Sequence, residues 1–143
     1  MHINYMKVAG AGVVGTLVMT AVGLWMAPMM GMPAMNPAEM LAGQMGGSLA
    51  LGWMGHLMIG VILAVIYAMV AAGRLPGPPA VRGAVYGLAP WLLAQLMVMP
   101  MMGMPVFSGS MSLAGGSLLG HLIYGAVIGG IIGEVGAGAL RAA

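Results

Sequence analysis

The chain has 143 residues, of which 62% are hydrophobic and only 4% are charged, and its mean hydropathy is +1.06. A soluble domain carries about a quarter charged residues, so this composition excludes an ordinary water-exposed surface. Four basic and two acidic residues give a formal net charge of +2. That charge is too small for a nucleic-acid-binding face, so nucleic acid is excluded as a partner.

Residues that carry chemistry are equally sparse. The chain has no cysteine, which excludes disulfides, thiolate zinc sites and iron–sulfur clusters. It has no aspartate, and its only carboxylates are Glu39 and Glu134. Paired-carboxylate hydrolysis and Ser-His-Asp catalysis therefore lack their residues, and we expect a protein that is not an enzyme.

Four apolar segments are long enough to span a bilayer, whose core requires roughly 20 apolar residues in a helix. The first follows Lys7 directly and is interpreted as a retained helix rather than a signal peptide. The expected fold is a single all-α domain over residues 1–143 with four transmembrane helices. The expected spans are about 8–27, 49–72, 81–99 and 117–139.

The basic residues predict how the spans are oriented. In a four-span arrangement they all fall on one side, and they are Lys7, Arg74, Arg82 and Arg141. Lys and Arg concentrate on the cytoplasmic side of membrane proteins. We therefore expect both termini in the cytoplasm, a location in the inner (cytoplasmic) membrane of a bacterium, and two methionine-rich loops outside.

The sequence repeats itself in order. Residues 28–33 read PMMGMP and residues 100–105 read PMMGMP again, while Gly55-His56-Leu57 recurs as Gly120-His121-Leu122. Each copy comprises one span, one Pro/Met loop and a second span. Both copies begin in the cytoplasm, so we expect two parallel-repeat helical hairpins related by a pseudo-two-fold axis along the membrane normal.

A short helix is predicted between the first two spans, over about 37–45 at the outer interface. Asn36 is a good N-cap, a proline suits the first turn, and Glu39 stands three residues after the cap. Glu39 is therefore interpreted as part of the cap rather than as a catalyst.

The spans contain few polar residues. Gln95 is a candidate for a hydrogen bond between helices. Glu134 lies near the inner end of the fourth span, where we expect it either to pair with Arg74 or Arg82 or to carry protons.

Small residues recur at every fourth position in spans two and four, and such ridges let membrane helices approach closely. A histidine interrupts each ridge, so both histidines are expected to face other helices rather than lipid. The ridges are Gly52, His56, Gly60, Ala64, Ala68 and Ala72 in span two, and Ser117, His121, Gly125, Gly129, Gly133 and Ala137 in span four.

Counting residues places His56 about 27 Å and His121 about 30 Å from the cytoplasmic ends of their helices, level with the outer loops. The two imidazoles approach each other if spans two and four meet at the pseudo-axis, and stay apart if each packs only within its own hairpin. Ionisable groups in a membrane usually serve function. The alternative is that each histidine bonds a loop carbonyl and anchors that loop.

The outer methionines suggest a metal. Thioether and imidazole ligands both suit Cu(I), so the two histidines and the loop methionines form a candidate copper site. In the alternative, the methionines are apolar residues that cover the outer end. A bis-histidine haem b on His56 and His121 is a further alternative, although no outer Arg or Lys would meet the propionates. The candidate metal ligands are His56, His121, Met29, Met30, Met32, Met101, Met102 and Met104.

The motif order resembles that of a family of small four-helix bacterial membrane proteins of unknown function, over nearly the whole chain. The resemblance implies the topology and supplies no activity or ligand. The residues that carry it are Gly52-Trp53, His56, Ile59-Gly60, Leu75-Pro76-Gly77-Pro78, Arg82-Gly83, Tyr86-Gly87, Met99-Pro100, Gly103 and the run from Gly120 to Val127.

The expected function is that of a non-enzymatic membrane protein in contact with the lipid bilayer. Its glycine-rich helices favour a subunit or scaffold of a larger membrane complex, with other subunits or copies of itself as partners. The alternatives are a small carrier or channel along the pseudo-two-fold axis and the haem protein above.

Overall fold

The computed structural model describes residues 3–134 and is all-helical, with no strand in that range. Within the described chain, four helices are long and apolar enough to cross a membrane, as the sequence predicts. Their length and composition are those of a multi-pass membrane protein. They cover Tyr5–Met29, Leu49–Ala71, Pro79–Met101 and Met111–Ile132.

The structure divides these spans into shorter elements, and two lie between spans. α3 follows its Asn36 cap, whose side chain accepts from the Ala38 N–H at 3.1 Å, and it forms the short helix expected after that residue. The elements are α1 Tyr5–Ala21, η1 Val22–Met26, α2 Ala27–Met29, α3 Pro37–Gln44, α4 Leu49–Ile66, η2 Tyr67–Ala71, α5 Pro79–Leu93, η3 Ala94–Val98, α6 Met99–Met101, η4 Val106–Gly109 and α7 Met111–Ile132.

The fourth span lies earlier in the chain than the predicted 117–139. α7 begins after Ser110, whose side chain accepts a hydrogen bond from the Leu113 N–H at 3.3 Å and so caps the helix. It ends before Gly133, which has a φ of 74° that an α-helix cannot contain. Residues 135–139 of the predicted span, and Ala137 of its ridge, lie outside the described residues.

The first three spans each contain a wider π-helical turn that the sequence did not lead us to expect. In η1 and η3 this turn lies just before Pro28 and Pro100. A proline within a helix has no N–H and its ring crowds the carbonyl four residues earlier. Widening the preceding turn accommodates that ring without ending the helix.

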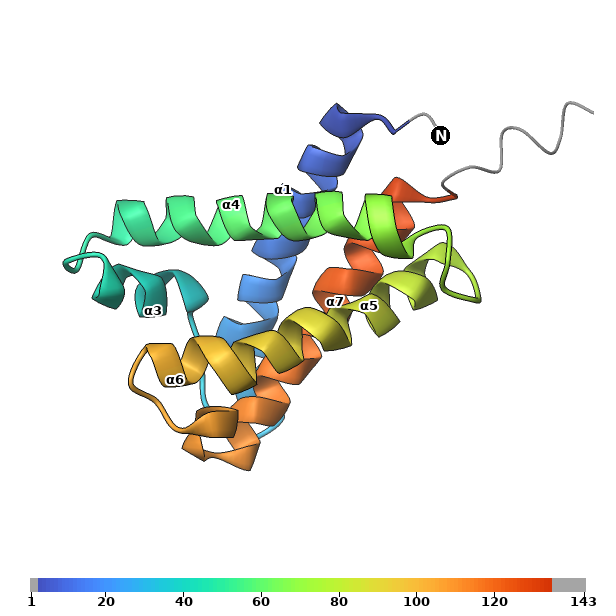
Figure 1. The fold of residues 1–143 in the computed structure, drawn as a ribbon. Coiled ribbons are helices and arrows are strands. Elements are labelled where there is room, and N and C mark those ends of the chain that lie inside the picture. The colour runs from blue at the N-terminus through green and yellow to red at the C-terminus, as the bar shows by residue number, and fades with distance from the viewer. Residues whose placement is uncertain (1–2, 135–143) are drawn as a thin grey trace, which may run out of the picture.

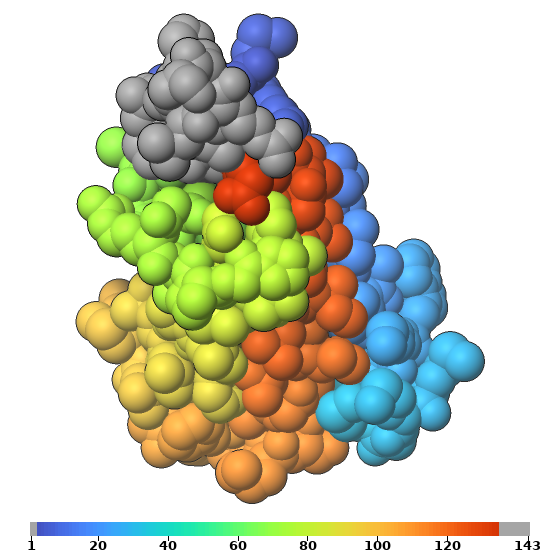
Figure 2. All heavy atoms as spheres, turned by 90° about the vertical axis from the view of Figure 1, so that its right-hand side faces the viewer, coloured from blue at the N-terminus to red at the C-terminus, as the bar shows by residue number. Residues whose placement is uncertain are grey.

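Two of the four spans, α1 and α7, pack against each other, and each of them carries one further span (Figure 1). α1 packs against both α4 and α7, and α5 packs along α7. Viewed from the side, α7 runs between α1 and α5 (Figure 2). α4 and α5 approach each other near η2 and diverge toward the other end, where α3 packs on α4.

α5 and α7 touch backbone to backbone. A Cβ added at Gly125 would lie 2.0 Å from the Gly83 carbonyl oxygen, and one added at Gly83 would lie 1.9 Å from the Gly125 oxygen. One turn along α7, a Cβ on Gly129 would lie 2.2 Å from the Pro79 oxygen. Real side chains cannot occupy these positions, so the glycines set the distance between the two helices.

The charged residues of the described chain gather at one end, except for Glu39 on α3. Arg82 donates to Glu134 at 2.8 Å and to the Ala72 carbonyl at 3.1 Å, and Lys7 donates to the Ile132 carbonyl at 3.1 Å. Of the two partners expected for Glu134, the structure selects Arg82. These bonds fasten α5 and the first span to the end of α7.

We predict that Gly125→Ala destabilises the protein, whereas Gly130→Ala on the same helix does not. The first change forces backbone apart and should cost about 1–3 kcal/mol, as other overpacking substitutions do. At Gly130 a Cβ would meet only the Ala80 Cβ, at 4.0 Å. Thermal unfolding in detergent, followed by circular dichroism, measures both variants. Equal melting temperatures for the two would contradict the backbone contact.

Candidate functional site

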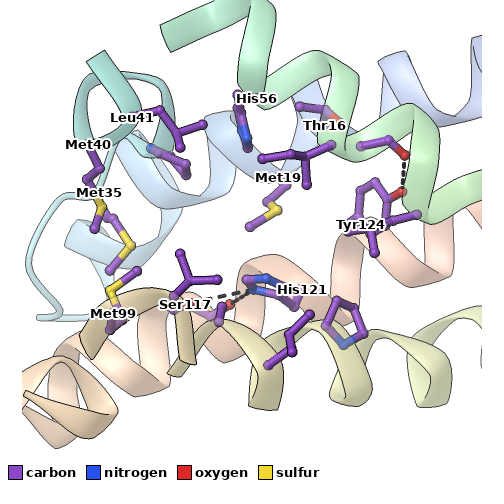
Figure 3. A pocket seen from close by; sticks show the side chains of 18 of the residues that line it. Thr16, Met19, Met35, Met40, Leu41, His56, Met99, Ser117, His121 and Tyr124 are labelled. Atoms are coloured by element: carbon purple, nitrogen blue, oxygen red, sulfur yellow. Dashed lines mark hydrogen bonds between the residues drawn. The ribbon is translucent and has the colours of Figure 1, made fainter. Parts of the chain in front are cut away.

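A cavity of about 180 Å³ lies between α4 and α5 where these helices diverge, and it is partly open to the surroundings (Figure 3). α1 and α7 contribute to its inner wall, and α3 with the segment before it closes one end. Its wall is almost entirely apolar. It is lined by Thr16, Met19, Met35, Pro37, Met40, Leu41, His56, Ile59, Gly60, Leu63, Pro90, Leu93, Ala94, Val98, Met99, Met102, Ser117, His121 and Tyr124.

Both small-residue ridges face inward as predicted. Every ridge position of span two is buried, and so are the first four of span four. His56 on α4 and His121 on α7 are 7% and 8% exposed and line the same cavity. The two histidines therefore line opposite walls of one cavity, although spans two and four make little direct contact, because α1 packs against both α4 and α7. The Tyr124 hydroxyl, donating to the Gly60 carbonyl, also ties α7 to α4.

His56 is held through its Nε2 atom. Nε2 lies 3.0 Å from the Thr20 hydroxyl oxygen, and that hydroxyl donates its own hydrogen to the Thr16 carbonyl at 2.9 Å. When the Thr20 hydroxyl keeps its single hydrogen on the Thr16 carbonyl, it accepts from Nε2–H of His56. In the neutral imidazole this assignment leaves Nδ1 of His56 with a lone pair.

His121 is held through the opposite nitrogen. Its Nδ1 lies 2.8 Å from the Ser117 carbonyl oxygen, which can only accept, so Nδ1 carries the hydrogen and Nε2 carries the lone pair. With this assignment at His56, the two histidines have opposite tautomers. Within residues 3–134 neither lone-pair nitrogen has a hydrogen-bond partner, yet the only fully buried side-chain polar atom without one is Arg82 Nε. Both of these nitrogens are therefore not fully buried, and both side chains line the cavity.

A series of buried hydrogen bonds leads to Ser117, the residue whose carbonyl accepts from His121. Gln95 on the third span donates to the Ser117 hydroxyl at 3.3 Å and accepts from the Ser108 hydroxyl at 3.0 Å. Gln95 thus makes the bond between helices that the sequence suggested. The bond from Ser108 also holds η4, where Phe107 and Ser108 have φ values of 52° and 57° that residues other than glycine seldom adopt. No sequence signal marks this pair.

The structure places the six methionines of the two PMMGMP loops in different surroundings. Met102 lines the cavity and Met32 lies beside Gly115 and Gly116 at the start of α7, whereas Met104 is half-buried. The remaining three are exposed at the protein surface. These are Met29 (88%), Met30 (60%) and Met101 (81%).

Four other methionines line the cavity, and the sequence analysis missed them. Met35 and Met40 reach it from the segment that ends in α3, and Met99 reaches it from α6. Met19, from α1, places its sulfur in the space between the two imidazoles (Figure 3). Met40 lies on the short helix that the sequence predicts after Asn36, and Met35 directly precedes that residue. Nothing in the sequence distinguishes Met19 from the other methionines within the spans.

The chain matches no curated protein and no solved structure. A family described as "Family of unknown function (DUF6789)" matches residues 3–139, a range that includes every residue on which the resemblance was based. The chain, with its four candidate membrane spans, therefore belongs to the DUF6789 family, whose function is unknown.

Proposed function

We propose that the protein is a non-enzymatic membrane protein that holds a small ligand in the cavity between α4 and α5, as a subunit of a larger membrane complex. The observation that carries this proposal is the pair of buried histidines, each with one nitrogen accessible from an apolar cavity of about 180 Å³. Ionisable groups are costly within a membrane and usually serve a ligand or substrate there.

Binding without catalysis is favoured by where the reactive groups lie. Glu39 accepts from the Asn36 side chain at 3.0 Å on α3, and Glu134 pairs with Arg82 at the opposite end. In the cavity wall the Thr16 hydroxyl is occupied by the Gly12 carbonyl at 2.8 Å. Of the ionisable side chains in the described part of the chain, the two imidazoles are those that a ligand in the cavity can engage.

The cavity favours a holding protein over a carrier or a haem protein. A carrier needs a path from the cavity to the end of the bundle where the charged residues lie. Between His121 and that end, the backbone contact of Gly83 with Gly125 leaves no gap between α5 and α7. Pockets for drug-sized ligands begin at about 300 Å³, and a haem is larger than such ligands. The outward faces of α4 and α5 are apolar and suit either lipid or the helices of a partner subunit.

We further propose that both termini are cytoplasmic and that the two hairpins are parallel repeats. Lys7, Arg74 and Arg82 support this orientation because they lie at the same end of the described chain. The repeats are supported by the two PMMGMP turns. The Met32 N–H donates to the Ala27 carbonyl and the Met104 N–H to the Met99 carbonyl, both at 3.0 Å. Gly31 and Gly103 have φ values of 80° and 79°.

The orientation can be tested with single cysteines, because the natural chain has none. In Met30→Cys the thiol is at the end that we place outside, and in Pro76→Cys at the end that we place inside; both positions are exposed. A membrane-impermeant maleimide should label only Met30→Cys in spheroplasts and both variants after permeabilisation. Labelling of Pro76→Cys alone in intact spheroplasts would reverse the orientation.

Ligand holding can be tested with toluene as a probe, observed by NMR of the protein labelled at its methionine methyl groups. We expect saturable shifts at Met19, Met35 and Met99 and none at the exposed Met29, because only the first three line the cavity.

The substitution Ala94→Phe fills the cavity and should abolish those shifts, whereas Ala89→Phe on the exposed face of α5 should preserve them. Shifts that never saturate, or that persist in Ala94→Phe, would refute the binding cavity.

The proposed membrane complex is tested separately, by gentle extraction of the protein from the native membrane. Recovery of the chain alone in every preparation would remove that part of the proposal.

A further inference from the structure

We propose that the ligand is a soft monovalent metal ion, Cu(I) in the cell, bound by Met19 Sδ, His56 Nδ1 and His121 Nε2; this inference rests on the proposed function because it fills the same cavity. The three side chains come from α1, α4 and α7, and they converge on one space (Figure 3). No two of them share a helix, so the site exists only when the bundle is assembled.

The hydrogen bonds of the two imidazoles are those of metal ligands. A ligating histidine almost always donates its other N–H to a backbone carbonyl or a similar acceptor, which fixes the ring and exposes the lone pair. His121 does so with the Ser117 carbonyl at 2.8 Å, and His56 does so with the Thr20 hydroxyl at 3.0 Å. Under this assignment the free nitrogen is Nδ1 in His56 and Nε2 in His121, neither nitrogen is fully buried, and both side chains line the cavity.

Met19 is fixed beside these rings by packing. Its side chain lies against Gly120, where an added Cβ would come within 3.2 Å of Met19 Cγ. Gly120 immediately precedes His121, so the missing side chain at this position lets the thioether approach the second imidazole. In the second copy of the repeated Gly-His-Leu motif, the histidine is therefore one ligand and the glycine leaves space for the Met19 thioether, which is another.

The chemistry of the cavity selects a soft, singly charged ion. Thioether and imidazole ligands suit Cu(I). Among the described residues no carboxylate lines the cavity, and no cluster of three histidine or acidic side chains is present to hold a harder ion. Zinc normally requires a thiolate, a carboxylate or a third imidazole. A doubly charged ion would also be far more costly to bury in an apolar wall.

The PMMGMP methionines fit a route of access. Met29, Met30 and Met101 are exposed at the end that we place outside, and Met102, next to Met101, lines the cavity. An ion captured by exposed thioethers at the surface would pass by way of Met102 to the histidines. This differs from the sequence-based expectation, in which the loop methionines themselves complete the site.

The probe for the test is Ag(I), which has the charge and softness of Cu(I) and needs no reductant. We expect one Ag(I) per full-length chain in nanodiscs by isothermal titration calorimetry. Met19→Leu keeps the side chain apolar and of similar size but removes the sulfur. It should weaken binding at least about tenfold, the lower limit for the loss of even an indirect contact to a metal. Met58→Leu removes a sulfur from the exposed face of α4 and should leave the affinity unchanged.

Thr20→Val tests the positioning of His56. It is near in shape to threonine and removes the acceptor of Nε2–H, so Ag(I) affinity should fall by about 10–100-fold. Circular dichroism and saturable toluene shifts show whether each variant is folded with its cavity intact. If Met19→Leu does not fold, the comparison of Thr20→Val with Met58→Leu decides the question.

The outcomes separate the two proposals. Saturable toluene binding without Ag(I) binding would overturn the metal inference and leave the binding cavity standing. Loss of both would overturn both. Ag(I) binding that is lost in Met29→Leu or Met101→Leu, but kept in Met19→Leu, would place the ion on the loops and overturn the site described here.

Discussion

The close approach of α5 and α7 is the constraint on which the rest of the structure depends. Gly83 and Gly125 lie so close that neither can carry a side chain. Lipid tails are as apolar as leucine, so membrane helices gain little by burying large side chains and associate instead through close packing of small residues. Since α5 is held against α7 along its length, it does not follow α4, and the two diverge to leave the cavity.

The second constraint is that polar groups in a bilayer must be satisfied within the protein. Thr16, Thr20 and Gln95 are each buried and each hydrogen-bonded, two of them back to their own helix and the third to neighbouring side chains. The outer imidazole nitrogens depart from this pattern. In the described chain the ring nitrogens that lack a bond belong to side chains that line the cavity, where a ligand can reach them.

Much of the fold could be predicted because it follows from composition and local pattern. The four spans, the inward-facing ridges and the interhelical bond of Gln95 are visible in the sequence, which also offered Arg82 as one of the partners for Glu134. The start of α7 was missed because Ser110 caps it inside a run that is otherwise weakly apolar. The π-helical turns were missed because hydropathy does not report how a helix accommodates a proline.

The candidate site was predictable only in part, for a physical reason. Both histidines carry the signal of an ionisable group inside a span, and both reach the cavity. Met19 carries no such signal, since methionine occurs throughout this chain and only the packing of α1 against Gly120 distinguishes it. The loop methionines had the clearer motif, but three of them are exposed at the surface.

The central claim is that two neutral imidazoles line one cavity in the membrane, that they carry their hydrogen on different ring nitrogens, and that the other nitrogen of each is free to bind a ligand. Nitrogen-15 NMR of histidine-labelled protein in lipid bilayers tests it most directly, because protonated and unprotonated ring nitrogens resonate far apart. The account predicts an unprotonated Nδ1 at His56, an unprotonated Nε2 at His121, and coupling of these two nitrogens to silver when Ag(I) is added. Identical tautomers at the two residues, or silver coupling at the opposite nitrogens, would contradict it.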